Sequence, residues 1–189
     1  NGAGKSTLFS LLAGTERVSS GTIRVDSRDI TRLAAYKRAR LGIGIKRQML
    51  SLFMDLSVRE NLWLAGYAAT GSKAAANDRA ERLLDGLGLA GNPDLPADSL
   101  SHGHQQWLEM GMVIAQEPAL VLLDEPTASL DPNTAYAVEN LIENWALARP
   151  DERASLWVSH DPLQARRVAS RELRVEAGRV MAQTEEAVR

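Results

Sequence analysis

The 189-residue chain contains no cysteine, no long apolar run and no excess of either charge. Without cysteine, a disulfide framework, a thiolate nucleophile and a cysteine-ligated metal site are all excluded. No segment approaches the ~18 apolar residues that a membrane-spanning helix needs, so we expect any membrane role to depend on a partner. Lys and Arg number 22 against 24 Asp and Glu, and this balance does not predict a nucleic-acid partner.

The composition, 44% hydrophobic and 24% charged, is typical of one folded domain rather than a disordered chain. Apolar runs typical of strands alternate with apolar stripes at helical spacing, which predicts an α/β fold. We expect a single domain over residues 1–189 with a helical subdomain over residues 49–116. The predicted strands are 22–26, 119–123 and 154–159, followed by a hairpin at 171–182, and residues 41–48 form a short apolar run.

The first seven residues, NGAGKST, match the second half of the phosphate-binding pattern GxxxxGK[ST]. The first Gly of that pattern would fall two residues before Asn1, so we expect a truncated fragment that lacks the preceding strand. Glycines let backbone N–H groups point at phosphate oxygens, Lys5 supplies a positive charge, and Ser6 is placed to ligate Mg2+. A helix from about Lys5 to Ala13, ended by Gly14, would direct its positive end at the same anion. The alternative is a glycine turn that only caps this helix.

Two predicted strands end in side chains that carry chemistry. Asp124 and Glu125 follow the apolar run 119–123, where an open α/β sheet places its ligands. His160 follows the strand 154–159. Each could instead have no role in chemistry, since acidic residues are common at strand ends and a lone His is more often structural. Asp-Pro pairs at 131 and 161 predict the N-cap and first residue of two helices.

Other segments leave structural and functional alternatives open. The apolar stretch 49–64, which includes Phe53 and Met54, predicts the core of a small helical unit, or else a docking surface. The basic stretch 32–40, which includes Arg38, is more typical of a solvated helix face than of a binding patch. Asn77 or Asp78 can cap a helix that carries apolar residues at 80, 83, 84 and 87.

The order of these motifs resembles the nucleotide-binding domain of ABC (ATP-binding cassette) ATPases. NGAGKST is similar to the Walker A loop, Gln48 to the Q-loop glutamine, and LSHGHQQ (100–106) to the signature motif LSGGQ. LVLLDEP (120–126) is similar to Walker B with its glutamate, residues 129–131 to the D-loop, and His160 to the switch histidine. The resemblance implies a P-loop NTPase core with a mostly parallel sheet, a partial antiparallel β subdomain and an inserted helical subdomain.

The resemblance also implies roles for individual residues. Glu125 would be the general base, His160 would contact the γ phosphate, and Asp131 would link two sites across a dimer. Mg2+ would be held by Ser6, Gln48 and Asp124. The Walker A loop of one subunit would bind ATP through Asn1, Gly2, Ala3, Gly4, Lys5, Ser6 and Thr7. The signature motif of the other subunit would cover the γ phosphate with Ser101, His102, Gly103 and His104. His104 departs from the family, which has Gln there.

Within this family the sequence most resembles importer subunits for branched-chain amino acids or urea. Three stretches carry this resemblance: ARLGIGIKRQ, LSVRENLWLA and LSHGHQQWLEMGM. Such a subunit implies a second ATPase subunit, a separate membrane permease and a solute-binding protein. It would lie on the cytoplasmic face of the membrane as a peripheral protein. The alternatives are a soluble ABC ATPase that acts on ribosomes or DNA, and a fragment without function of its own.

Overall fold

A three-stranded parallel sheet lies at the centre of the molecule. In a computed structural model of the chain, residues 4–46, 51–128 and 130–181 are described. The sheet has the order β3 (Ile43–Lys46), β4 (Leu120–Asp124) and β5 (Ala154–Val158). Ile43 pairs with Leu120, and Leu120 in turn with Ala154. The α/β prediction with a parallel sheet is confirmed, and the carboxyl ends of the three strands share one edge.

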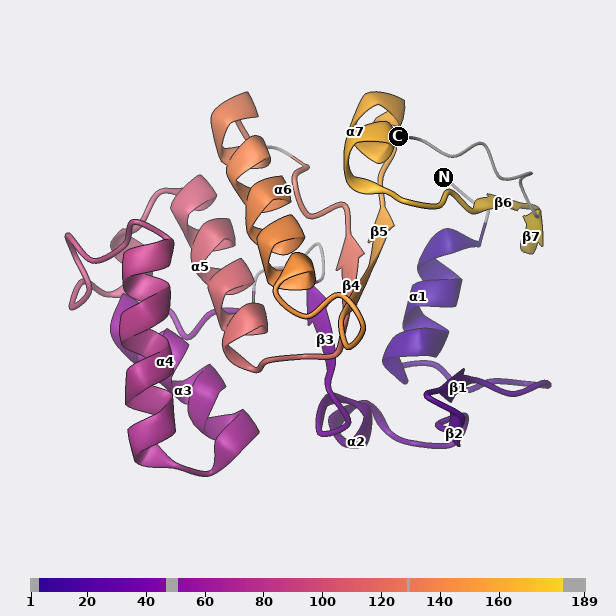
Figure 1. The fold of residues 1–189 in the computed structure, drawn as a ribbon, viewed down its shortest axis with the longest axis horizontal. Coiled ribbons are helices and arrows are strands. Elements are labelled where there is room, and N and C mark those ends of the chain that lie inside the picture. Colours follow the sequence, from indigo (N-terminus) through magenta and orange to yellow (C-terminus); the bar gives the residue numbers. More distant parts are fainter. Residues whose placement is uncertain (1–3, 47–50, 129, 182–189) are drawn as a thin grey trace.

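The central strand β4 is buried on both faces, as its continuous apolar run predicts. Val121 and Leu123 pack with α5 (His102–Ala115) and α6 (Pro132–Leu147), whereas Leu122 packs on the other face with Phe9 of α1 (Lys5–Ala13). Figure 1 shows α5 and α6 on one side of the sheet and α1 on the other. Because alternate side chains point to opposite faces, one strand holds both helical layers together.

The predicted start of α4 is wrong. The helix spans Lys73–Gly86, and its N-cap is Ser72 rather than Asn77 or Asp78, which lie within the helix. The small residues at 71–77 predict a loop before that cap, but the three alanines at 74–76 favour helix. The preceding helix α3 (Val58–Thr70) begins with a capping box, in which Ser57 and Glu60 bond each other's backbone N–H.

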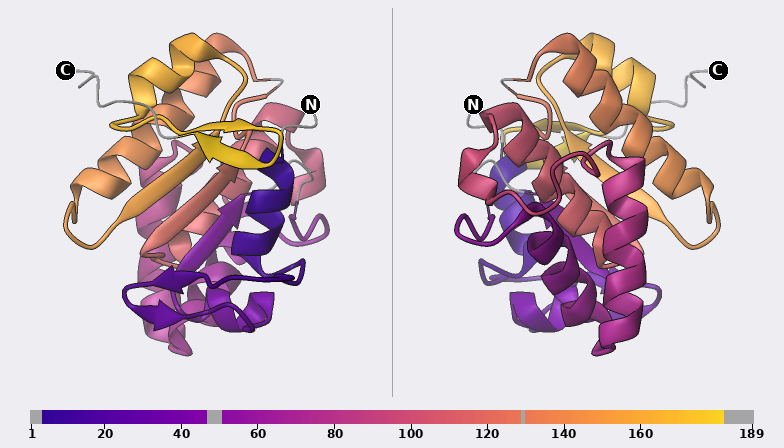
Figure 2. Two further views of the ribbon diagram at one scale, coloured as in Figure 1. Left: turned by 90° about the vertical axis from the view of Figure 1, so that its right-hand side faces the viewer. Right: turned by 90° about the vertical axis from the view of Figure 1, so that its left-hand side faces the viewer.

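Helices α3, α4 and α5 share a second apolar core, and the right-hand view of Figure 2 shows these helices at the front. Leu62, Leu84 and Leu108 are fully or almost fully buried there. This core confirms that most apolar residues of the segment after residue 51 pack inward. Phe53 and Met54 are the exceptions, with 51% and 37% of their surface exposed.

We expect Gly111→Ala to destabilise this helical core. A Cβ at Gly111 would lie 2.5 Å from Leu87 Cδ1 and 3.0 Å from Leu62 Cδ2. Overpacking of this kind costs about 2 kcal/mol where the neighbours must shift. Urea unfolding checks the value, with Gly86→Ala as the control because nothing lies within 4 Å of a Cβ there. Equal stabilities for the two variants would contradict the close packing.

The interpretation of the basic stretch as a solvated face is wrong for Arg38. This side chain on α2 (Ala35–Ala39) is 1% exposed. Its guanidinium donates to the carbonyls of Leu11 and Leu12 at 2.6 and 2.8 Å, and to those of Thr31 and Leu33. Burial lowers the Arg38 pKa. Arg38 therefore supplies further donors for the last carbonyls of α1, of which Leu11 O also accepts from the Gly14 N–H at 3.3 Å.

Two short antiparallel pairs complete the structure, β1 (Arg24–Val25) with β2 (Arg28–Asp29) and β6 (Arg174–Glu176) with β7 (Arg179–Met181). The first pair is shorter than the strand predicted at 22–26; the second confirms the predicted hairpin. The β6–β7 hairpin lies beside the N-terminal end of α1 (Figure 2). A Cβ on Gly4 would come within 3.1 Å of Gly178 Cα, so this close approach requires glycine.

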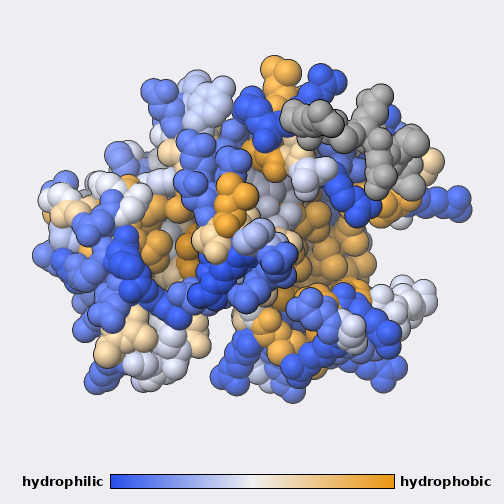
Figure 3. Space-filling model, in the orientation of Figure 1, coloured by the Kyte–Doolittle hydropathy of each residue, from blue (hydrophilic) through white to orange (hydrophobic). Residues whose placement is uncertain are grey.

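The surface over α1 and the neighbouring edge of the sheet is apolar, as Figure 3 shows. Strand β5 is the edge strand there and pairs with β4 alone within the described ranges. Across those same ranges, every helix falls short of the length and apolarity that a bilayer span demands.

Candidate functional site

Lys5, Glu125 and His160 meet at the carboxyl edge of the sheet. Lys5 begins α1, Glu125 follows β4, and His160 follows β5. Lys5 Nζ lies 3.3 Å from His160 Nδ1, and His160 Nε2 lies 2.9 Å from Glu125 Oε1. Because an ammonium is only a donor, Nδ1 must accept, so Nε2 carries the proton and donates to the carboxylate. Three residues that are far apart in the sequence thus form one hydrogen-bonded chain.

The backbone holds Glu125 in an unusual conformation. Its φ is 49°, in the left-handed region that a residue with a Cβ seldom adopts. Its N–H donates to the Val158 carbonyl at 3.0 Å, which ties it to the end of β5. Strained backbone of this kind is concentrated at functional sites, where surrounding contacts hold it in place. In this conformation the Glu125 carboxylate lies 2.9 Å from His160 Nε2.

Asp124 lies beside this group at the end of β4. Burial raises the pKa of its carboxyl, the negative charge of Glu125 raises it further, and His160 and Lys5 act in the opposite direction. A cation near Asp124 would lower that pKa by favouring the carboxylate. The Ser6 hydroxyl in the first turn of α1 and the Asp124 carboxylate are hard oxygen donors, which fit Mg2+.

The start of α1 has the form of an anion site. Its N-cap, Gly4, has φ 95°, and no side chain of the described residues caps the helix. The first N–H groups of a helix have no partner within the helix and carry a positive partial charge, so they bind phosphates. Thr7 lies in the same first turn and is exposed. The other predicted phosphate-loop residues (Asn1, Gly2 and Ala3) and Gln48 lie outside the described residues.

The residues that resemble the signature motif lie at the start of α5, away from Lys5. Ser101 is the N-cap and accepts from the His104 backbone N–H at 3.3 Å, and its hydroxyl lies 2.8 Å from His104 Nδ1. His102 Nε2 contacts Gln106 Nε2 at 2.9 Å, and Gly103 belongs to the same turn. Both views in Figure 2 place α5 and α1 on opposite faces of the sheet. One chain therefore does not bring its own Ser101 to its own Lys5.

Asp131 is the N-cap of α6, as the Asp-Pro pair predicts. Its carboxylate accepts from the Thr134 hydroxyl at 2.6 Å and from the backbone N–H groups of Asn133 and Thr134. The Thr134 side-chain bond, followed by the backbone bonds, lowers the Asp131 pKa. Asp131 is thus fixed as a carboxylate at an exposed helix start.

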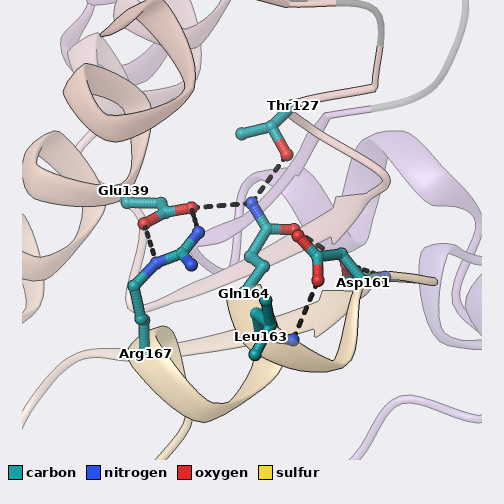
Figure 4. Close-up of polar contacts among 7 residues, drawn as sticks. Thr127, Glu139, Asp161, Leu163, Gln164 and Arg167 are labelled. Atoms are coloured by element: carbon teal, nitrogen blue, oxygen red, sulfur yellow. Dashed lines mark hydrogen bonds and ion pairs between the residues drawn. The ribbon is translucent and has the colours of Figure 1, made fainter. Parts of the chain in front are cut away.

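A buried polar network beside His160 was not predicted from the sequence. Figure 4 shows the Gln164 carboxamide between Thr127, Glu139 and the loop that contains Asp161. A groove of about 440 Å³ runs along this network from Glu125 and His160 to Arg167. Thr127 and Gln164, which bond each other, are 37 positions apart in the sequence, and no motif marks the members of this network, so sequence spacing carried no signal.

Comparison with known proteins bears on this arrangement. The family model described as "ABC transporter" matches residues 1–128. The methionine import ATP-binding protein MetN of Geobacillus kaustophilus is 34% identical over 98% of this chain and 54% of its own length. The lipopolysaccharide export ATP-binding protein LptB of Acidithiobacillus ferridurans is 35% identical over 76% of this chain and 60% of its own length. The chain spans about half to three fifths of these relatives.

Among solved structures, a dimeric ATP-binding cassette in a post-hydrolysis state, bound to ADP and Pi, superposes with a TM-score of 0.81. It is 26% identical, and the match covers 99% of this chain and 82% of that one.

Proposed function

The chain belongs to the ABC transporter family, and from this premise we propose that it is the ATP-hydrolysing part of a membrane transporter. The observation that carries the proposal is the hydrogen-bonded group of Lys5, His160 and Glu125 at the carboxyl edge of the sheet. The transfer of a phosphoryl group to water requires a positive charge near the phosphates and a base that activates the water. The Lys5 ammonium suits the first requirement and the Glu125 carboxylate the second, with the His160 imidazole between them.

In this proposal each residue of the group has a separate task. Lys5 and the first N–H groups of α1 hold the β and γ phosphates of ATP. Glu125 accepts the proton of the attacking water. His160 lies between Glu125 and the γ phosphate and contacts the phosphate through its Nε2–H. Asp124 and Ser6, together with Gln48, would hold Mg2+, which neutralises charge on the phosphate oxygens.

We infer that the complete site needs two chains. Helix α5 starts with the residues that resemble the signature, Ser101, His102, Gly103 and His104, and it lies on the opposite face of the sheet from α1, which Lys5 begins. A second copy, or a related subunit, in a head-to-tail arrangement would bring these residues to the γ phosphate, with Asp131 linking the sites. One solved relative is a dimer with ADP and Pi bound. ATP binding then favours the closed pair, and hydrolysis reopens it.

We further propose that the closing motion drives import of a small solute through a separate permease, supplied by a solute-binding protein. The subunit would be peripheral to the cytoplasmic face of the membrane, and residues 49–116 would form its helical subdomain. Branched-chain amino acids or urea are the proposed cargo, and only the sequence resemblance of the three stretches described above supports this choice. Relatives named for methionine import and for lipopolysaccharide export show how widely cargo varies in this family. All relatives reported above are named as transport proteins, which does not favour the ribosome or DNA alternative.

Charged substitutions at Phe53 and Met54 are expected to abolish solute uptake while ATP binding persists. Both side chains are exposed and apolar in the segment that precedes α3, and we propose that a permease docks there. A radiolabelled uptake assay and co-purification with the permease check this for Phe53→Glu and Met54→Glu. Leu147→Glu is the matched control, because Leu147 is 64% exposed and lies at the end of α6. Uptake and assembly that survive at Phe53 and Met54 would remove this surface from the docking role.

A further inference from the structure

Gln164 bridges the two loops that carry Glu125 and His160. It lies in the first turn of α7 (Pro162–Val168) and is 4% exposed. Its amide Nε2 donates to Thr127 Oγ1 at 2.7 Å, two residues beyond Glu125. Its carbonyl Oε1 accepts from the Ser159 hydroxyl at 2.7 Å, immediately before His160. One buried side chain therefore joins both loops.

The orientation of the Gln164 amide is fixed by the charge of Glu139 on α6. Gln164 Nε2 donates to Glu139 Oε1 at 2.9 Å. Burial alone would raise the Glu139 pKa, but the bonds from Arg167 and Gln164 outweigh it and lower the pKa. Arg167 holds the carboxylate through two nitrogens, at 2.9 and 3.1 Å. An ionised carboxylate only accepts, so the amide nitrogen must face it and the amide oxygen must face Ser159.

This orientation continues into the backbone around His160. The Ser159 hydroxyl, which donates to Gln164, accepts from the Asp161 backbone N–H at 3.0 Å. Asp161 in turn caps α7 by accepting from the Leu163 N–H at 2.8 Å. The residues on both sides of His160 are thus anchored to one fixed carboxamide (Figure 4). A buried network in which each member has a partner confers rigidity.

We propose that Gln164 is a positioning residue for ATP hydrolysis. The hydrogen bonds that link Arg167, Glu139 and Gln164 set the spacing of Glu125 and His160. The inference rests on the proposed function, because those two residues carry the chemistry there. Gln164 itself acts through Ser159 and Thr127, not on the substrate. Its contribution is the placement of base and histidine before ATP arrives, where displacements of about 1 Å cost about 100-fold in rate.

The test uses the full-length protein. Gln164→Leu is expected to lower kcat about 10- to 100-fold and to leave KM for ATP within about 2-fold, because Lys5 and α1 are untouched. Thr127→Val removes one bond of the bridge and is expected to lower kcat less. It also keeps the test decisive if the leucine variant folds poorly.

Gln164→Glu adds a readout that a purely structural role would not move. The introduced carboxyl faces Glu139, so at neutral pH two carboxylates, both acceptors only, oppose each other and the bond to Glu139 is lost. When the introduced carboxyl is protonated it donates again. The ratio of variant to parent kcat is therefore expected to rise as the pH falls from 8 toward 6.

Ile142→Ala on α6 is the matched control, because Ile142 is buried in the core between α6 and the sheet. It is expected to lower the melting temperature and leave kcat unchanged. If Gln164→Leu also lowers stability alone, with kcat unchanged, the positioning role is overturned. Glu125→Gln in the same assay separates the two claims. If Glu125→Gln leaves hydrolysis intact, the proposed catalytic assignment fails, whereas loss with Glu125→Gln and none with Gln164→Leu overturns this inference only.

Discussion

Glu125→Gln in the full-length protein is expected to slow ATP turnover about 1,000-fold while ATP still binds, the range in which a general base contributes. The amide keeps the size of the side chain and can still accept from His160 Nε2, which lies 2.9 Å from Glu125 Oε1 in the structure. It cannot take a proton from water. Phosphate release under single-turnover conditions measures the loss, and equilibrium binding of ATP shows that the nucleotide site persists.

The same variant is expected to accumulate as a closed dimer, because the step that reopens it is blocked. Size-exclusion chromatography with Mg2+ and ATP checks this. Glu143→Gln is the control, since Glu143 is an exposed residue on α6 away from the site. If Glu125→Gln turns over ATP at the parent rate, Glu125 is not the base.

Glu109→Ala is expected to cost about 4 kcal/mol of folding free energy and to lower the melting temperature by about 10 °C. Glu109 Oε2 lies 2.8 Å from Lys46 Nζ, and both side chains are at least 95% buried. The other carboxylate oxygen accepts from the Ser51 backbone N–H at 2.9 Å. The substitution removes the buried carboxylate that pairs with Lys46 at the end of β3, and with it the acceptor of the Ser51 N–H.

Thermal and urea unfolding measure this effect. Glu152→Ala is the control, because the pair of Glu152 with Arg149 is exposed and spans 3.6 Å, so its loss is expected to cost less than about 1 kcal/mol. Equal losses in the two variants would contradict the view that the Lys46 and Glu109 pair ties β3 to the helical core.

Segments with one dominant local signal could be predicted from the sequence. The apolar run that forms β4, the Asp-Pro pair that starts α6 and the Gly14 that ends α1 each fix an element through nearby residues. The errors fall where distant partners decide. Arg38 is a charged residue in a basic stretch, and only the folded chain brings the carbonyls of Leu11 and Leu12 to it.

The candidate site shows the same division. Lys5, Glu125 and His160 stand in motifs, so their chemistry could be predicted, although their contact depends on the parallel register of β4 and β5. Gln164 stands in no motif. Its role depends on the ionised Glu139 and on Arg167, which the packing of α6 beside α7 brings within hydrogen-bond distance.

The central claim is that two chains share each ATP site, and mixing two inactive variants tests it most directly. Lys5→Ala removes the phosphate-binding cation, and Ser101→Ala removes the α5 hydroxyl on the other face of the sheet. In a head-to-tail pair of one chain of each kind, one site carries both defects and the other carries none. We predict that each variant alone is inactive and that an equal mixture of the two recovers about a quarter of the parent ATPase rate, since half of the pairs are mixed. No recovery on mixing would contradict a shared site.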